Sequence, residues 1–249
     1  MRAPASASTK LVTGRQAILS RALPLRAVLF DVDFTLARPG PELGPDAYRR
    51  AGEQYGLELD PARYDQARID ALEGLQKHPE LEHDEEIWFA FTERIVRGMG
   101  GGDNASTREC AVEIERRWER SQNFSLYDDA LPTLELLRRH GLKLGLVSNG
   151  ARDLDEFVAD HKLEVDAALG SRGHGWTKPH PSIFHAVLLQ LGVAAEEAVM
   201  VGDSPEDDIE GAKALGMRAF LLDRENRYPD HEDRLDDLRA LPAAIGLSH

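Results

Sequence analysis

Four short apolar runs, each followed by polar residues, constrain the fold of this chain more than any other feature of its sequence. The runs span residues 27–30, 142–147, 198–201 and 219–222. Continuous apolar runs of this length are typical of strands buried on both faces. Residues 132–140 and 181–191 have helical apolar spacing, and Gly141 and Gly192 stand where a helix C-terminal glycine belongs. The alternation of strand and helix predicts a doubly wound, Rossmann-like parallel α/β sheet.

The segment after the first run has a different pattern. It is rich in Glu, Arg, Ala and Leu, shows helical spacing and contains no clear strand run. The helical spacing is found in residues 48–55, 87–99 and 108–120. We therefore predict a helical cap at 41–124, inserted into an α/β core made of residues 26–40 and 125–249.

Composition excludes several classes of protein. Of the 249 residues, 42% are hydrophobic and 30% charged, and no apolar run approaches the roughly 20 residues that a bilayer span needs. The formal net charge of −14 argues against nucleic acid as the main partner, because proteins that bind nucleic acid concentrate Lys and Arg. Cys110 is the only cysteine, which excludes an intrachain disulfide. A globular protein without a membrane role, monomeric or homodimeric, is the expectation.

The N-terminal 25 residues form a basic extension. The first 30 residues contain no Asp or Glu but five Lys or Arg residues among Ala and Ser. This composition is similar to that of an organellar transit peptide, although an extension of a cytoplasmic protein explains it more simply. We expect a cytoplasmic protein and keep organellar targeting as the alternative.

Acidic pairs follow two of the predicted strands. Asp31 and Asp33 follow the first, and Asp203 and Asp208 follow the run at 198–201. One carboxylate of such a pair can attack while the other moves protons, and clustered carboxylates are hard oxygen ligands for Mg²⁺. Each pair alone is common in loops and helix starts. Ligands of open parallel sheets bind where the strands end, so the two pairs are expected to share one crevice.

Two further polar groups fall at the same predicted edge. Ser148 and Asn149 follow the run at 142–147, and can donate hydrogen bonds to a phosphoryl oxygen or cap a helix. Lys178 lies between turn residues ahead of the helix at 181, where its charge can neutralise a phosphate or face solvent.

The order of these four groups resembles the motif pattern of the haloacid dehalogenase superfamily, in the branch whose helical cap follows the first motif. The resemblance covers roughly residues 26 to 225 and includes Thr35 in the first motif. It implies that Asp31 attacks phosphorus and that Asp33 protonates the leaving alcohol and then activates water. The substrate would be a small phosphorylated metabolite.

The same resemblance assigns the remaining groups. Mg²⁺ would be held by Asp31, the backbone carbonyl of Asp33, and Asp203, with Asp208 supporting the metal or Lys178. Ser148, Asn149, Lys178 and Thr35 would contact the phosphoryl group. Four carboxylates and a phosphate dianion cannot share a site without cations, and Lys178 and a divalent metal supply them.

Phe34 departs from the family pattern, which usually has Gly at this position. A bulky residue resists the backbone dihedrals that glycine permits, so the turn after Asp33 is expected to be altered or the pocket narrowed. In the predicted cap, His83 and Trp88 could contact substrate, although a partly exposed helix face explains both.

Three other functions use much the same residues. A dehalogenase would leave Asp33 idle, since no alkoxide needs protonation, and this favours phosphate chemistry. A phosphomutase would return the phosphoryl group to a sugar phosphate instead of water. A non-catalytic binding protein on the same scaffold should have lost at least one catalytic group, and none is missing.

Overall fold

A six-stranded parallel sheet forms the centre of the molecule. A computed structural model describes residues 24–247, so most of the basic extension predicted at 1–25 lies outside the described residues. The strands are β1 (Ala27–Phe30), β4 (Lys143–Ser148), β5 (Ala167–Gly170), β6 (Ala198–Gly202), β7 (Arg218–Leu222) and β8 (Arg234–Leu235). Their order is β5-β4-β1-β6-β7-β8, and every pair is parallel. The predicted doubly wound sheet is thus confirmed.

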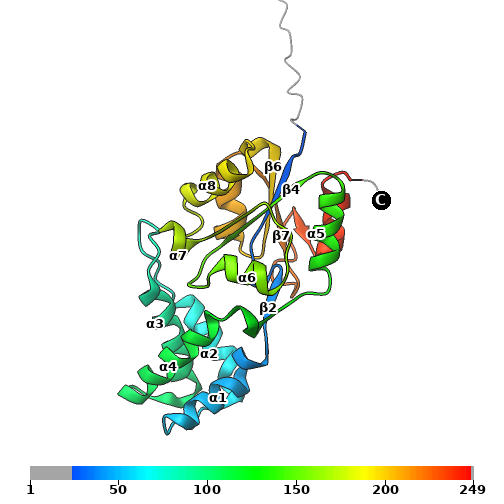
Figure 1. Cartoon of the computed structure of the whole chain (residues 1–249). Coiled ribbons are helices and arrows are strands. Elements are labelled where there is room, and N and C mark those ends of the chain that lie inside the picture. Colours follow the sequence, from blue (N-terminus) through cyan, green and yellow to red (C-terminus); the bar gives the residue numbers. More distant parts are fainter. Residues whose placement is uncertain (1–23, 248–249) are drawn as a thin grey trace, which may run out of the picture.

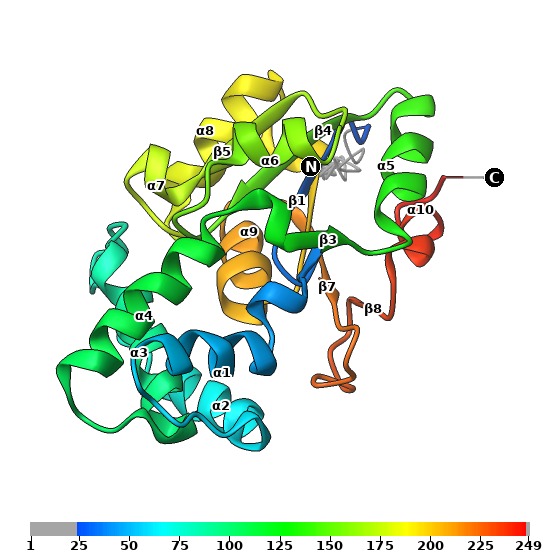
Figure 2. The ribbon, with the colours of Figure 1, turned by 60° about the horizontal axis from the view of Figure 1, so that its bottom comes forward.

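Helices cover both faces of this sheet (Figures 1 and 2). On one face lie α5 (Ala130–Arg139), α6 (Leu154–Asp160) and α10 (Leu241–Ala244); on the other lie α8 (Pro181–Leu191) and α9 (Gly211–Ala214). The side chains of β1 alternate between the two cores, with Val28 and Phe30 in one and Leu29 in the other. This period of two explains why a strand buried on both faces is apolar throughout.

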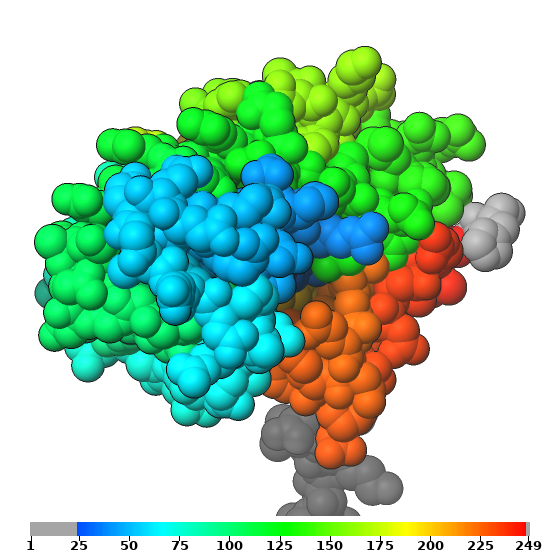
Figure 3. All heavy atoms as spheres, turned by 90° about the horizontal axis from the view of Figure 1, so that it is seen from below, coloured from blue at the N-terminus to red at the C-terminus, as the bar shows by residue number. Residues whose placement is uncertain are grey.

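The predicted insert is helical and has its own core. It contains α1 (Pro45–Gln54), α2 (Tyr64–Glu73), α3 (Glu85–Val96) and α4 (Ala105–Trp118). Tyr48, Ile95, Met99 and Ile114 are buried together between these helices. Asn104 begins α4 by accepting a hydrogen bond from the Thr107 amide at 3.0 Å. Seen from below, the cap lies in front of part of the core, and the orange and red C-terminal residues of the core stay visible beside it (Figure 3).

Several elements were not predicted. β2 (Ala37–Pro39) and β3 (Phe124–Leu126) form a two-stranded antiparallel sheet where the chain enters and leaves the cap. Helix α7 (Ser171–His174) follows β5, and short helical turns occupy 41–43, 61–63, 97–101, 121–123, 195–197, 205–210 and 238–240. β5, β8, α2 and α6 were also not predicted. No helix among the described residues is long and apolar enough to span a membrane.

The cap also contacts the core away from the β2–β3 connection. The Leu81 carbonyl accepts hydrogen bonds from the Thr177 amide at 2.8 Å and the Thr177 hydroxyl at 3.0 Å, and the His83 amide donates to the Gly175 carbonyl at 2.9 Å. This contact joins the cap to the segment that leads directly into Lys178.

Candidate active site

A cavity of about 220 Å³ lies between the cap and the carboxyl ends of the central strands. Asp31 and Asp203 follow β1 and β6, Ser148 is the last residue of β4, and all three line the cavity. The Asp31 amide donates to the Val201 carbonyl at 2.9 Å, which continues the strand pairing as far as Asp31. The cavity lining brings together these sequence-predicted residues: Asp31, Asp33, Ser148, Asn149, Lys178, Asp203 and Asp208.

Lys178 joins two of the predicted acids, Asp31 and Asp208. Its ammonium lies 2.5 Å from Asp31 Oδ1 and 2.6 Å from Asp208 Oδ1, and Lys178 is 1% exposed. Asp208 is oriented further by the Ser204 amide, which donates to Oδ2 at 3.0 Å. A Cβ at Gly202 would overlap the Asp208 carboxylate, which explains the glycine in this loop.

Burial sets the protonation of this group. It raises the pKa of Asp31 well above its usual value, and the nearby Asp208 and Asp203 charges add to the rise against the lowering effect of Lys178. Burial by itself would lower the pKa of Lys178, but the Asp208 and Asp31 carboxylates outweigh it and raise that pKa. Lys178 is therefore a permanent cation shared by two carboxylates.

Asp203 completes an acidic cluster with Asp31 and Asp208. One carboxylate oxygen from each lies within 4.8 Å of the others. Burial, and then the charge of Asp208, raise the pKa of Asp203 to about 6, while Arg227 Nη2 donates to its Oδ2 at 3.1 Å. Lys178 contacts Asp31 and Asp208, and Arg227 contacts Asp203, so three carboxylates face two cations and the remaining negative charge suits a hard divalent cation.

Ser148 and Asn149 have different surroundings. The Ser148 hydroxyl makes a weak contact, 3.5 Å from the Asn149 carbonyl, and it lines the cavity. The Asn149 side chain accepts from the Lys178 amide at 2.7 Å and donates to the Lys178 carbonyl at 3.1 Å. Asn149 thus fixes the backbone that carries the catalytic Lys candidate, while phosphate binding by its side chain stays a prediction.

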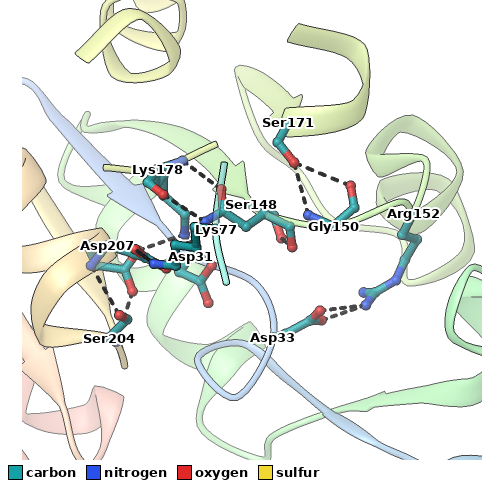
Figure 4. Close-up of polar contacts among 12 residues, drawn as sticks. Asp31, Asp33, Lys77, Ser148, Gly150, Arg152, Ser171, Lys178, Ser204 and Asp207 are labelled. Carbon is teal, nitrogen blue, oxygen red and sulfur yellow. Dashed lines mark hydrogen bonds and ion pairs between the residues drawn. The ribbon is translucent and has the colours of Figure 1, made fainter. Parts of the chain in front are cut away.

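Arg152 was not predicted as a site residue. Its Nη2 lies 2.6 Å and 2.8 Å from the two carboxylate oxygens of Asp33 (Figure 4). The guanidinium is 3.5 Å from the centre of the Phe124 ring, and the residue is 8% exposed. A search restricted to polar residues at strand ends misses Arg152, because it lies four residues after β4; a buried cation facing an acid becomes visible only in three dimensions.

The turn after Asp33 keeps the backbone that glycine would adopt. Phe34 has φ of 62°, in the left-handed region that bulky residues rarely occupy, and its amide donates to the Ala37 carbonyl at 2.7 Å. Phe34 therefore adopts the left-handed backbone that a bulky residue was predicted to resist, and it lines the cavity. Thr35 is fully buried and outside the cavity lining, and its hydroxyl has no hydrogen-bond partner among the described residues.

Residues of the cap also reach the site. Lys77 donates to Asp207, whose other oxygen accepts from Asn149 Nδ2 at 3.4 Å. Trp88 lines the cavity, whereas His83 hydrogen-bonds to Ser171 Oγ at 2.9 Å and is not part of the cavity wall. Sequence reasoning missed Lys77, since nothing marks a lone Lys in a loop.

This fold and this cluster define a hydrolase with an α/β core and an acidic site under a helical cap. Residues 25–216 match the model of the haloacid dehalogenase-like hydrolase family, and the chain belongs to that family. The predicted family is thereby confirmed, and the chain is an enzyme of the hydrolase class.

Similar proteins within this family have different activities. A phosphoserine phosphatase of Thermus thermophilus is 37% identical over 63% of this chain and 66% of that protein. A glyceraldehyde 3-phosphate phosphatase of Methanopyrus kandleri is 31% identical over 86% of this chain and 90% of that protein. The solved 2-haloacid dehalogenase of Pseudomonas syringae is 26% identical with a TM-score of 0.57, covering 89% of this chain and 98% of that one.

Proposed function

We propose that the chain is a Mg²⁺-dependent phosphatase that hydrolyses a small phosphate monoester through an aspartyl-phosphate intermediate. The observation that carries this proposal is the pairing of Asp31 with Lys178 beside Asp203 and Asp208, in a cavity that also holds Asp33. Nucleophile, cation, metal-binding oxygens and a separate acid are the parts that phosphoryl transfer from an alcohol requires. The phosphatase relatives support the same choice.

The residues present fit a magnesium ion. Asp31 and Asp203 supply hard oxygen ligands, and Asp208 lies within reach but already binds Lys178 and the Ser204 amide. The Asp33 carbonyl stays a predicted ligand. When bound, the ion would supply positive charge that offsets the clustered carboxylates and the phosphate.

Each step of the reaction then has its residue. Asp31 attacks phosphorus, and the bond from phosphorus to the ester oxygen breaks. Asp33 gives its proton to the leaving alkoxide. In the second step Asp33 takes a proton from a water molecule that attacks the same phosphorus, which releases inorganic phosphate and restores Asp31. Ser148 donates its hydroxyl proton in a hydrogen bond to a phosphoryl oxygen throughout, and Lys178 holds Asp31 in place.

Metal removal tests the proposal most directly. We expect phosphate release from a generic aryl phosphate to fall by about 10²-fold or more in excess chelator and to return when Mg²⁺ is added, because the acidic cluster repels an anionic substrate. The measurement is inorganic phosphate released with time. Full activity in chelator would exclude the metal role, and no release from any ester by folded protein with Mg²⁺ would favour the phosphomutase, dehalogenase or non-catalytic alternatives.

Arg152 is expected to act by positioning Asp33. Replacing Arg152 by Met should lower kcat by about 10²-fold, since a general acid must stand within hydrogen-bond reach of the leaving oxygen. KM should change little, because Arg152 holds Asp33 and is not expected to bind the substrate itself. Arg152→Lys should recover part of the loss. An Arg152→Met enzyme with wild-type kcat, or one in which kcat and KM change together without recovery in Arg152→Lys, would show that the contact is structural only.

A further inference from the structure

The cavity has two ends of different chemistry. Asp31, Asp33, Ser148, Lys178 and Asp203 form the phosphate end, on the core side. The cap supplies an apolar end made of Tyr64, Leu72, Trp88, Phe91, Ile95 and Trp118. The same wall also includes four polar side chains, which are Arg68, Thr92, Glu115 and Glu119.

Part of this apolar wall is not needed by the core of the cap. Leu72 is 46% exposed, and neither it nor Trp88 belongs to the buried cluster between the cap helices. Apolar side chains that the cap does not use for its own packing, and that face a reaction site, are typical of a ligand-binding wall. The wall is continuous with the phosphate end within one cavity, so its occupant is the organic part of the substrate.

One carboxyl group stands within the apolar wall. Glu115 of α4 lines the cavity, and its Oε2 accepts from the Thr92 hydroxyl at 2.7 Å. Burial raises the pKa of Glu115. Thr92 occupies only one of its lone-pair sites, so Glu115 retains acceptor capacity toward the cavity. Glu119, also in the lining, has Arg172 as an ion-pair partner at 3.8 Å and is less available.

We infer that the substrate is the phosphate ester of a small alcohol with an apolar, ring-containing skeleton and one group that donates a hydrogen bond to Glu115. This inference rests on the proposed function. A cavity of about 220 Å³ is small for a ligand site and favours a compact organic group beside the phosphate. A sugar would still place part of its hydroxyl groups against Trp88, Phe91 and Ile95, and burying those hydroxyl groups without partners is unfavourable.

A set of phosphate esters of primary alcohols tests the inference while keeping the leaving-group chemistry alike. We expect kcat/KM for 2-phenylethyl phosphate to exceed that for glycerol 1-phosphate and phosphoserine by about tenfold or more. A hydrophobic pocket can discriminate between an apolar and a polar substrate by this much. A hydroxyl at the ring position para to the side chain should raise kcat/KM by a further factor of about five, because Glu115 accepts its proton in a hydrogen bond.

Variants separate the two parts of the wall. Glu115→Met should abolish the preference for the hydroxylated ring, and Trp88→Ala should reduce the preference for a ring over glycerol. Glu109→Met, an exposed change on the same helix outside the cavity lining, should leave both preferences unchanged. Thermal unfolding checks that each variant folds.

The outcomes distinguish failure of this substrate inference from failure of the phosphatase proposal on which it rests. Faster hydrolysis of phosphoserine or glycerol 1-phosphate than of both ring esters would overturn the inference and leave the phosphatase proposal standing. If phosphoserine is the faster substrate, Arg68 at the cap end would be the residue that binds its carboxylate. An unchanged hydroxyl preference in Glu115→Met would overturn the role of Glu115. No release from any ester by folded, Mg²⁺-supplied wild type would overturn the phosphatase proposal itself, and the inference with it.

Discussion

Replacing Asp31 by Asn should reduce phosphate release by about 10⁴-fold or more, because loss of a covalent nucleophile removes the reaction path and not only a favourable contact. Asn has nearly the same shape as Asp, so the cavity keeps its form. The amide oxygen of the substituted side chain can still accept from Lys178, and Lys178 keeps Asp208 as its second carboxylate. The activity loss should therefore occur in a correctly folded protein.

Thermal unfolding provides the matching control for Asp31→Asn. Asp31 is buried with a raised pKa, next to Asp208 and Asp203. Replacing it removes repulsion between carboxylates as well as one ion pair, so Tm should stay within about 3 °C of the wild type. Asp33→Asn is the comparison at the same loop and should lose only about 10²- to 10⁴-fold, the range of general acid catalysis. Measurable turnover by Asp31→Asn close to that of Asp33→Asn would assign the nucleophile elsewhere.

The sequence predicted the parts of this molecule that short-range pattern determines. Strand β1 alternates between two cores, so all four residues are apolar, and the run is visible without any structure. Helix α8 begins at Pro181 and ends at Leu191 as predicted, because a proline first turn and a left-handed Gly192 mark its limits. The site acids were visible for a related reason, since they come directly after strands that the apolar runs had located.

Elements with mixed or short patterns were missed. Strand β5 has one buried residue, Ala167, followed by three partly exposed ones. Its sequence therefore contains no apolar run long enough to predict a strand. Helix α2 buries only Ala67 and Ala71, and its polar surroundings produce no apolar stripe. Strands β2 and β3 depend on pairing between residues far apart in the chain, which local spacing cannot indicate.

The missed site contacts are all long-range. Arg152 meets Asp33 across 119 positions of sequence, and Lys77 meets Asp207 across 130. Neither side chain has a local pattern that differs from a surface cation. At Phe34 a local pattern was visible but misleading. The sequence predicted that a bulky residue would resist this turn, yet the turn forms with Phe34 in the left-handed region. Tertiary contacts there overcome a local preference.

Lys178→Met should be the most damaging single change to stability in the site. Removing this buried cation leaves Asp31 and Asp208 as neighbouring carboxylates with no shared partner, and breaking a buried pair in this way costs about 3–5 kcal/mol of unfolding free energy. Tm should fall by about 10 °C, and phosphate release by about 10³-fold, since the charge that steadies Asp31 and phosphate is lost.

A second substitution distinguishes this explanation from simple loss of packing. In the double variant Asp31→Asn with Lys178→Met, one of the two unpaired carboxylates is gone, so part of the lost stability should return while activity stays absent. Stability then recovers without activity, which a packing defect at Lys178 cannot produce. Equal Tm values for the single and double variants, or a wild-type Tm for Lys178→Met, would show that the buried ion pairs do not hold this site together.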